Sequence, residues 1–176
     1  MNQKEIFNGH IFSVYQKEMD VNGKMMMRDL VVHPGGAAIR VIVDHKILLV
    51  RQTRAGIGNV STLEIPAGTI DPNEDPKICA MRELNEETGM EADDLSLITA
   101  FWPTPGYDSE VIYVYSAINP RVAKHRLAMD ETEDITQEWI DLDTAYQMIQ
   151  TGEIRDGKTI LAIYQAKLEQ FETKKS

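Results

Sequence analysis

Residues 68–90 read GTIDPNEDPKICAMRELNEETGM, and this stretch decides how the chain folds. Its centre predicts a helix over residues 76–88. Asp75 belongs to the residue types that cap helix N-termini, Pro76 suits the first helical position, and Gly89 suits the position after the last turn. The segment before the helix is rich in turn-forming residues, so we expect a loop followed by a helix.

Acidic side chains gather on one side of this expected helix. At about 100° per residue, Glu83, Glu86 and Glu87 share an arc of roughly 100°. We expect the opposite face to pack on a sheet, and its apolar residues are Ile78, Met81 and Leu84. The acidic face should then border a cleft.

The acidic face is unfavourable by itself. Like charges three or four residues apart on a helix cost about 0.2–0.5 kcal/mol each, and the helix dipole disfavours anions near its C-terminus. A divalent cation would relieve the repulsion, and oxygen ligands without histidine favour Mg²⁺ or Mn²⁺. The alternative is a solvated acidic face on which Arg82 pairs locally.

The spacing of residues 68–90 resembles the complete Nudix box, G-x5-E-x7-R-E-U-x-E-E-x-G-U, in which U is apolar. Every fixed position is matched, from Gly68 and Glu74 to Gly89, and Leu84 and Met90 fill the two apolar positions. The resemblance implies an α+β fold, an α/β/α sandwich on a mixed sheet. It also implies an enzyme that hydrolyses the diphosphate linkage of a nucleoside diphosphate joined to another moiety.

The same resemblance implies roles for individual residues. Glu83 and Glu87 would be direct metal ligands, Glu86 would bind a metal directly or through water, and the carbonyl of Ala67 would be a backbone ligand. Two or three Mg²⁺ ions are implied, with Mn²⁺ as a substitute. Arg82 would orient the glutamates, and with Glu86 it is counted among the catalytic residues.

The chain before the box divides into two parts. Residues 10–32 predict a β-hairpin, because Asn22-Gly23 is a strong two-residue turn signal between alternating strands. A Pro-Gly-Gly run at residues 34–36 then breaks the pattern. We therefore expect an N-terminal β-hairpin arm, residues 1–36, and a main domain, residues 37–176.

The rest of the pattern mixes strands and helices without regular alternation, which favours an α+β arrangement. Strands are expected at residues 37–43, 47–52, 63–65, 95–102, 110–118 and 135–141, and a loop at residues 53–60. Helices are expected at residues 143–151 and 158–172. The last helix carries an apolar stripe of Ile160, Leu161, Tyr164, Leu168 and Phe171.

Segments outside the box resemble ADP-ribose pyrophosphatases. LEIPAG at residues 63–68 is similar to the run that enters the box in that group, and LVRQTR at residues 49–54 to one of its strands. TPGYDSE at residues 104–110 is similar to an S-P-G-x-x-x-E segment, with Thr104 in place of serine. Thr53 replaces the usual tyrosine. The implied reaction is Mg²⁺-dependent hydrolysis of ADP-ribose, or a related ADP-sugar, to AMP and ribose 5-phosphate.

This second resemblance implies a set of substrate-binding residues: Arg28, Arg51, Arg54, Glu64, Pro105, Gly106 and Glu110. Glu110 would contact the terminal ribose, and the arginines are candidates for phosphate or adenine contacts. The plain alternatives are ordinary surface charge for the arginines and a simple β-turn for Pro105-Gly106.

A separate general base is expected in the acidic run Asp130–Asp134, which resembles a mobile catalytic loop of the family. Glu133 is the first candidate and Glu131 the second. A general base typically contributes about 10²–10⁴-fold to a rate. The alternative is a solvated run of charge.

Composition limits the classes of binding partner that this chain is expected to have. The 176 residues carry a formal charge of −10, which argues against nucleic acid and anionic membranes as partners. One cysteine cannot form an internal disulfide, which fits the cytoplasm. A homodimer is expected, because an isolated hairpin arm is marginally stable and the related pyrophosphatases exchange such arms.

Two other functions stay open at this stage. One is hydrolysis of another nucleoside diphosphate derivative, and the other is a non-catalytic module that binds ADP-ribose. Loss of a box glutamate would favour the second, and the box retains all of them.

Overall fold

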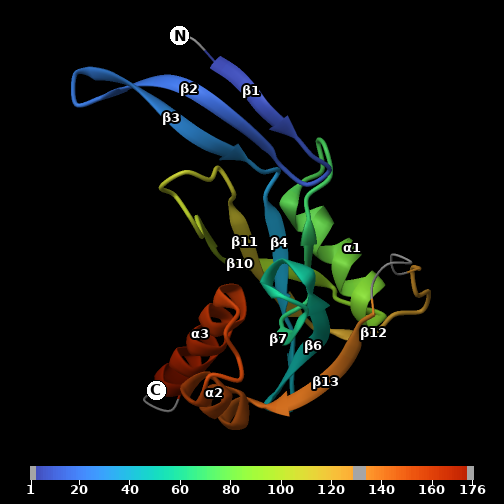
Figure 1. Ribbon diagram of the computed structural model, residues 1–176. Coiled ribbons are helices and arrows are strands. Elements are labelled where there is room, and N and C mark those ends of the chain that lie inside the picture. Colours follow the sequence, from blue (N-terminus) through green and yellow to red (C-terminus); the bar gives the residue numbers. More distant parts are fainter. Residues whose placement is uncertain (1–2, 129–133, 174–176) are drawn as a thin grey trace.

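The computed structural model describes residues 3–128 and 134–173. Helix α1 lies on one side of the strands, and helices α2 and α3 lie on the other, so the main domain is layered helix–sheet–helix (Figure 1). These helices span Pro76–Thr88, Leu142–Thr151 and Gly157–Thr173. The expected α+β sandwich is confirmed.

The first sheet of the main domain is mixed. Its order is β10-β11-β4-β8; β4 runs parallel to β11, and the other pairs are antiparallel. Its strands are β4 (Gly36–Arg40), β8 (Ala67–Thr69), β10 (Asp94–Phe101) and β11 (Ile112–Ile118). The sequence pattern missed β8, which is short and contains glycine.

The second sheet has the order β13-β6-β5, and β7 also pairs with β6. Its strands are β5 (Ile42–Val43), β6 (Lys46–Arg54), β7 (Val60–Glu64) and β13 (Thr136–Asp141). The expected strand 37–43 divides at Val41 into β4 and β5, which belong to different sheets. The expected loop 53–60 holds the end of β6, a short 3₁₀ helix η1 (Ala55–Ile57) and the first residue of β7. Two further strands form a small pair: β9 (Met90–Glu91) and β12 (Arg121–Val122).

The sheets bury apolar side chains on both faces. Ala37 and Ile39 of β4 belong to the core that packs under α1, whereas Ala38 belongs to the core under α2 and α3. This alternation follows from the two-residue period of a strand. Both faces of β4 are therefore covered, and its first residues are fixed next to the box.

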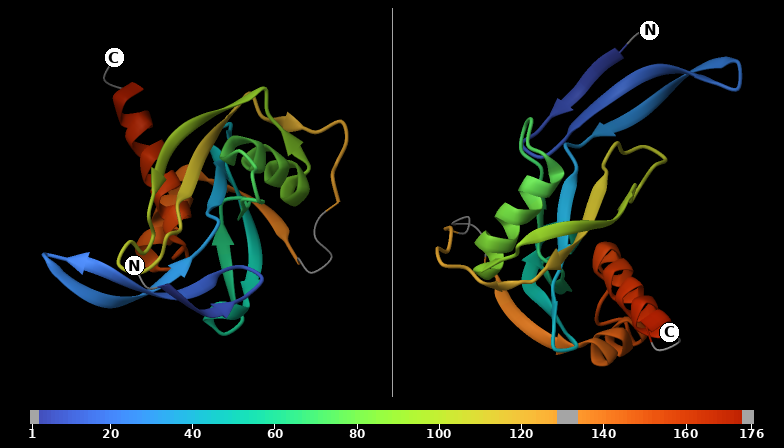
Figure 2. Two further views of the ribbon diagram at one scale, coloured as in Figure 1. Left: turned by 90° about the horizontal axis from the view of Figure 1, so that it is seen from above. Right: turned by 180° about the vertical axis from the view of Figure 1, so that it is seen from behind.

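The N-terminal arm is a separate three-stranded antiparallel sheet that projects from the main domain (Figure 2). It consists of β1 (Gln3–Asn8), β2 (Ser13–Val21) and β3 (Lys24–Val32). The expected hairpin is present, and Asn22 and Gly23 at its turn both have positive φ. Strand β1 was not expected, because its sequence, QKEIFN, does not alternate polar and apolar residues.

Two predicted helix faces were only partly right. On α1, Leu84 is fully buried and Met81 packs on the same core, as expected, but Ile78 is 63% exposed. The buried face also contains Glu83 and Glu87. On α3, Ile160 and Leu161 of the predicted stripe pack on the core, whereas Leu168 and Phe171 are exposed. The fully buried residues of this helix are Thr159, Ala162, Ile163 and Ala166. In both helices the contact includes small side chains, Cys79 and Ala80 on α1 and Ala162 and Ala166 on α3, which let the helix approach the sheet closely.

Of the helices in the described part of the chain, none has the length and apolar character that a membrane crossing requires.

Candidate active site

Helix α1 is held at both ends by the predicted caps. The Asp75 carboxylate accepts a hydrogen bond from the Lys77 backbone N–H at 2.8 Å. Gly89 adopts φ 64°, and its N–H donates to the Asn85 carbonyl at 2.7 Å. The helix is thereby fixed in the register that brings its glutamates to the loop at Ala67 and Gly68.

The chain at Gly68 passes directly against the carboxylate of Glu83. A Cβ atom at residue 68 would lie 1.9 Å from Glu83 Oε1, so only glycine fits without displacing that side chain. One residue earlier, the Ala67 N–H donates to Glu87 Oε2 at 3.0 Å. The loop before the box and the glutamates of α1 therefore form one packed unit.

Arg82 bridges the carboxylates of the box. Its guanidinium donates to Glu74 Oε1 at 3.0 Å, to Glu83 Oε1 at 2.6 Å and to Glu86 Oε2 at 2.9 Å. The hydrogen bonds from Arg82 lower the pKa of Glu74 to about 2. The same acidic partners raise the pKa of Arg82. Arg82 therefore contacts three carboxylates of the box at once, and its role in orienting them stays a prediction.

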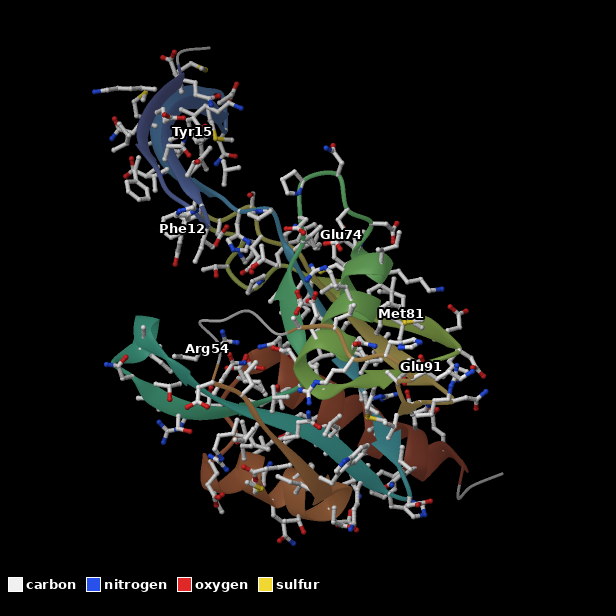
Figure 3. The ribbon with its side chains drawn as sticks, turned by 90° about the vertical axis from the view of Figure 1, so that its right-hand side faces the viewer. Phe12, Tyr15, Arg54, Glu74, Met81 and Glu91 are labelled. Carbon is white, nitrogen blue, oxygen red and sulfur yellow. The ribbon has the colours of Figure 1, made fainter. Side chains whose placement is uncertain are left out.

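A cavity of about 200 Å³ opens between this unit and the strands beside it. Side chains and backbone from distant parts of the chain line it: His33, Gly36, Ala37, Arg54, Ala67, Gly68, Thr69, Glu110, Ile112 and Lys158. We call it the box cavity. Figure 3 shows Arg54 and Glu74 in the main domain, apart from Phe12 and Tyr15 on the arm.

Arg54 enters the box cavity from the end of β6 and is held by Glu64. Its Nε and Nη2 atoms donate to the two carboxylate oxygens of Glu64 at 2.8 and 2.7 Å. Lys158 Nζ and Thr62 Oγ1 donate to the same carboxylate at 2.5 and 2.7 Å. Burial acts to raise the pKa of Glu64, but these donors outweigh it and hold the pKa at about 2.

Glu110 reaches the box cavity from the segment after the predicted turn. The turn is present: the N–H groups of Tyr107 and Asp108 donate to the Thr104 carbonyl at 3.3 and 3.1 Å. Glu110 Oε1 lies 3.5 Å from His33 Nδ1. The His33 N–H also donates to Ser109 Oγ at 3.0 Å, which ties this segment to the end of the arm.

The predicted substrate-binding residues do not all line one cavity. Arg54 and Glu110 line the box cavity, whereas Arg28, Pro105 and Gly106 line a separate cavity of about 590 Å³ below the arm. Two more lie elsewhere. Arg51 pairs with Glu138 at 2.5 Å between β6 and β13, and Glu64 borders a cavity of about 430 Å³ near η1.

The predicted bases Glu131 and Glu133 lie outside the described residues. The chain on either side is attached to α1. Asn85 receives the Leu127 N–H at 2.7 Å and donates to the His125 carbonyl at 3.1 Å. After the gap, Gln137 Nε2 donates to the Glu87 carbonyl at 3.1 Å.

Sequence reasoning missed His33 and Lys158, which both line the box cavity. The sequence assigned no chemistry to His33, and Lys158 belongs to a helix far from the box. Each lies near the box only through tertiary contacts, so no local pattern could have identified them.

Comparison with known proteins gives consistent matches. The NUDIX domain model matches residues 32–163. An ADP-ribose pyrophosphatase of Bacillus subtilis is 34% identical over 170 residues, covering 96% of this chain and 91% of that protein. A methanol dehydrogenase activator of Bacillus methanolicus is 33% identical over 169 residues, covering 95% and 91%. The crystal structure of an ADP compounds hydrolase matches with a TM-score of 0.84 at 22% identity, covering 98% of this chain and 94% of that one.

The sandwich fold and its glutamate-bearing loop–helix–loop define a pyrophosphohydrolase type of enzyme. The chain belongs to the Nudix family, as the match over residues 32–163 shows.

Nudix hydrolases generally use divalent cations, and the donors at the box suit them. The side chains of Glu83, Glu86 and Glu87 and the carbonyl of Ala67 offer hard oxygen atoms. As the side chains stand, no three acidic, histidine or cysteine side chains in the described residues converge closely enough to hold an ion. Arg82 lies between Glu83 and Glu86 instead. The donor set fits a divalent cation, because the carboxylates of Glu83 and Glu86 already gather around one cationic group, the Arg82 guanidinium. The Glu83 carboxylate also lies against Gly68, one residue from Ala67.

Proposed function

We propose that this protein hydrolyses the diphosphate linkage of ADP-ribose, or of a related ADP-sugar, to AMP and ribose 5-phosphate. One observation carries the proposal: Arg54, Glu110 and the backbone of the box meet in the box cavity. A cation for the diphosphate and a carboxylate for a sugar therefore line the same cavity as Gly68, against which the Glu83 carboxylate lies. The relative from Bacillus subtilis, named an ADP-ribose pyrophosphatase, supports this substrate.

In this proposal, Arg54 binds the diphosphate, because a guanidinium makes paired hydrogen bonds with phosphate oxygens. Glu110 accepts hydrogen bonds from hydroxyls of the terminal ribose and would repel additional phosphate groups. Arg28, Pro105 and Gly106 border the neighbouring cavity, where they would contact the adenosine half. Arg51 pairs with Glu138 outside both cavities, so it is the weakest member of the predicted set.

We further propose that Ala67, Glu83, Glu86 and Glu87 hold two or three Mg²⁺ ions, for which Mn²⁺ can substitute. Bound cations would neutralise the diphosphate and lower the pKa of a coordinated water. Arg82 keeps Glu83 and Glu86 oriented. Glu133, or Glu131 in its place, takes the proton from the attacking water. The water oxygen forms a bond to one phosphorus, and the bridging P–O bond breaks.

The proposed assembly is a homodimer formed through the arm, residues 1–36, with residues 37–176 as the hydrolase domain. Large apolar side chains of the arm are about half exposed: Ile6, Phe7, Met25 and Met27. A second copy of the chain would cover them. A cytoplasmic location remains part of the proposal, since the single cysteine, Cys79, cannot form an internal disulfide.

The function is tested by analysing products from a panel of nucleotide sugars, with Mg²⁺ and with excess EDTA. We expect AMP and ribose 5-phosphate from ADP-ribose with Mg²⁺ and no turnover with EDTA. Glu87→Gln keeps the shape of the side chain and removes its charge, so kcat should fall at least about 10²-fold. Turnover in EDTA would refute the metal assignment. A kcat/KM for dATP at or above that for ADP-ribose would refute the substrate assignment.

A further inference from the structure

The first turn of helix α3 reaches the box cavity from the far end of the sequence. Lys158 lines that cavity, and its side chain is 10% exposed. Its Nζ atom lies 2.5 Å from Glu64 Oε2 and 2.9 Å from Asp156 Oδ1. The ammonium group is therefore fixed between two carboxylates, although it belongs to a helix that packs on the face opposite α1.

Glu64 connects this lysine to Arg54. Glu64 is 3% exposed. Its carboxylate receives hydrogen bonds from Arg54, Lys158 and Thr62. Glu64 is not among the residues that line the box cavity, whereas Arg54 and Lys158 are. The carboxylate therefore serves as the fixed point against which the guanidinium of Arg54 is oriented.

The same turn of α3 holds the chain that leads into the box. Thr159 is fully buried, and its Oγ1 atom accepts a hydrogen bond from the Ile65 N–H at 2.8 Å. That hydroxyl donates to Asp156 Oδ2 at 2.5 Å. Ile65 stands two residues before Ala67, so α3 contacts both the carboxylate that holds Arg54 and the approach to the proposed metal ligands.

We propose that Lys158 is a positioning residue of the active site: it holds Glu64, and through Glu64 it fixes Arg54 for the diphosphate of the substrate. This inference rests on the proposed function. The ion pair between Lys158 and Glu64 differs from an ordinary surface pair. Both side chains are largely buried, and Lys158 itself lines the box cavity.

The expected effect concerns substrate binding more than the chemical step. Lys158→Met keeps most of the length of the side chain and removes the charge. Glu64 then loses one of its donors, so the partner that holds Arg54 is less firmly fixed. An arginine that binds the ground state and the transition state alike changes KM with little change in kcat. We therefore expect KM for ADP-ribose to rise on the order of tenfold, with kcat within about twofold.

A structural defect would give a different result. A variant that is partly unfolded has fewer active sites, so kcat falls and KM stays the same. Lys158→Arg keeps a cation and should restore most of the lost affinity. Lys167→Met is the matched control, because Lys167 lies on the same helix and pairs with Asp143, outside the box cavity. Its KM should equal that of the wild type.

A double-mutant cycle with Arg54→Gln tests whether Lys158 acts through Arg54. If it does, adding Lys158→Met to Arg54→Gln raises KM no further, since the effects of residues in one chain of contacts are not additive. Effects that multiply would overturn the proposal, because they would show that Lys158 acts on the substrate by itself. An unchanged KM in Lys158→Met would overturn it as well.

A substrate-independent readout separates this inference from the proposed function. The carboxyl carbon of Glu64 can be titrated by NMR in the wild type and in Lys158→Met. The pKa of Glu64, about 2 in the wild type, should rise when Lys158 is removed. An unchanged pKa would refute the contact itself. If ADP-ribose is not hydrolysed by the wild type, the proposed function fails; the cycle is then measured on the nucleotide sugar that is hydrolysed.

Discussion

Gly68 and Arg82 show how single residues shape the candidate site. Position 68 must be glycine for steric reasons, because the carboxylate of Glu83 occupies the position that a Cβ atom would take. Arg82 supplies a positive charge to three carboxylates, because its guanidinium donates to Glu74, Glu83 and Glu86. Both residues occupy fixed positions of the box, so substitutions at either one should affect the glutamates.

Gly68→Ala should displace Glu83 and lower kcat on the order of 10²-fold, since small errors in the placement of catalytic groups cost about that much. The global fold should survive, because the clash is with the end of one side chain. Gly56→Ala is the control, since a Cβ at residue 56 meets nothing within 4 Å. Steady-state kinetics and melting temperature check both. Equal activity in the two variants would contradict the close approach at Gly68.

Arg82→Lys should lower activity about 10–100-fold, the usual cost of losing a residue that orients metal ligands. A lysine carries the charge but cannot donate in the planar fork that bridges several carboxylates. Kinetics at saturating Mg²⁺ measure the effect. Activity within twofold of the wild type would exclude an orienting role for the guanidinium.

The same substitution should change how stability depends on pH. The pKa of Glu74 is about 2 in the folded protein, below its usual value, mainly because Arg82 donates to it. Its contribution to stability is therefore present above the unfolded-state pKa and is lost as the pH falls toward about 2. In Arg82→Lys the loss between those pH values should be smaller. Urea unfolding at a series of acidic pH values tests this, and identical curves would argue against it.

At the scale of elements, the bounds of helix α1 could be predicted from the sequence, whereas part of its buried face could not. Its ends follow from Asp75 and Gly89, and the structure has both caps. Its buried face does not follow from side-chain polarity, because Ile78 is exposed while Glu83 and Glu87 are buried. Cys79, Ala80 and Leu84 form the apolar part of the contact, and the Cys79 thiol lies near the carbonyls of the box loop.

Two alanine substitutions on α1 test this orientation. Leu84→Ala should destabilise the protein by about 2–5 kcal/mol, because Leu84 is fully buried. Ile78→Ala should stay within about 0.5 kcal/mol, as is usual for exposed positions. Denaturant unfolding measures both free energies. Equal losses would mean that the helix packs through the face that its sequence pattern predicted.

At the scale of the whole molecule, the arm stands apart from the hydrolase domain (Figure 2). Several of its large apolar side chains are about half exposed. Its connection to the main domain includes backbone hydrogen bonds between Val31 and the segment at Tyr107–Ser109. That segment leads directly to Glu110 in the box cavity. Any assembly formed through the arm would therefore lie on the side of the molecule where the box cavity opens.

We expect light scattering to give about twice the chain mass of 19.9 kDa at micromolar concentration. Met27→Lys should favour the monomer, because it places a charge among the exposed apolar residues of the arm. Val122→Lys is the control, since Val122 is 80% exposed and lies outside the arm. A wild-type protein that scatters as a 20 kDa particle would contradict the proposed dimer, and equal masses for the two variants would remove the arm from the interface.

The sequence by itself determined the family, the helix of the box and the layered α+β fold. These features depend on short spacings: a helix repeats every 3.6 residues wherever it packs, and its caps lie within its own segment. The tertiary structure decided which faces of α1 and α3 are buried and which distant residues meet. Arg54, Glu110 and Lys158 line one cavity although more than a hundred residues separate the first from the last. That meeting depends on how the sheets stack and how closely small side chains let the helices approach, and local sequence does not encode either.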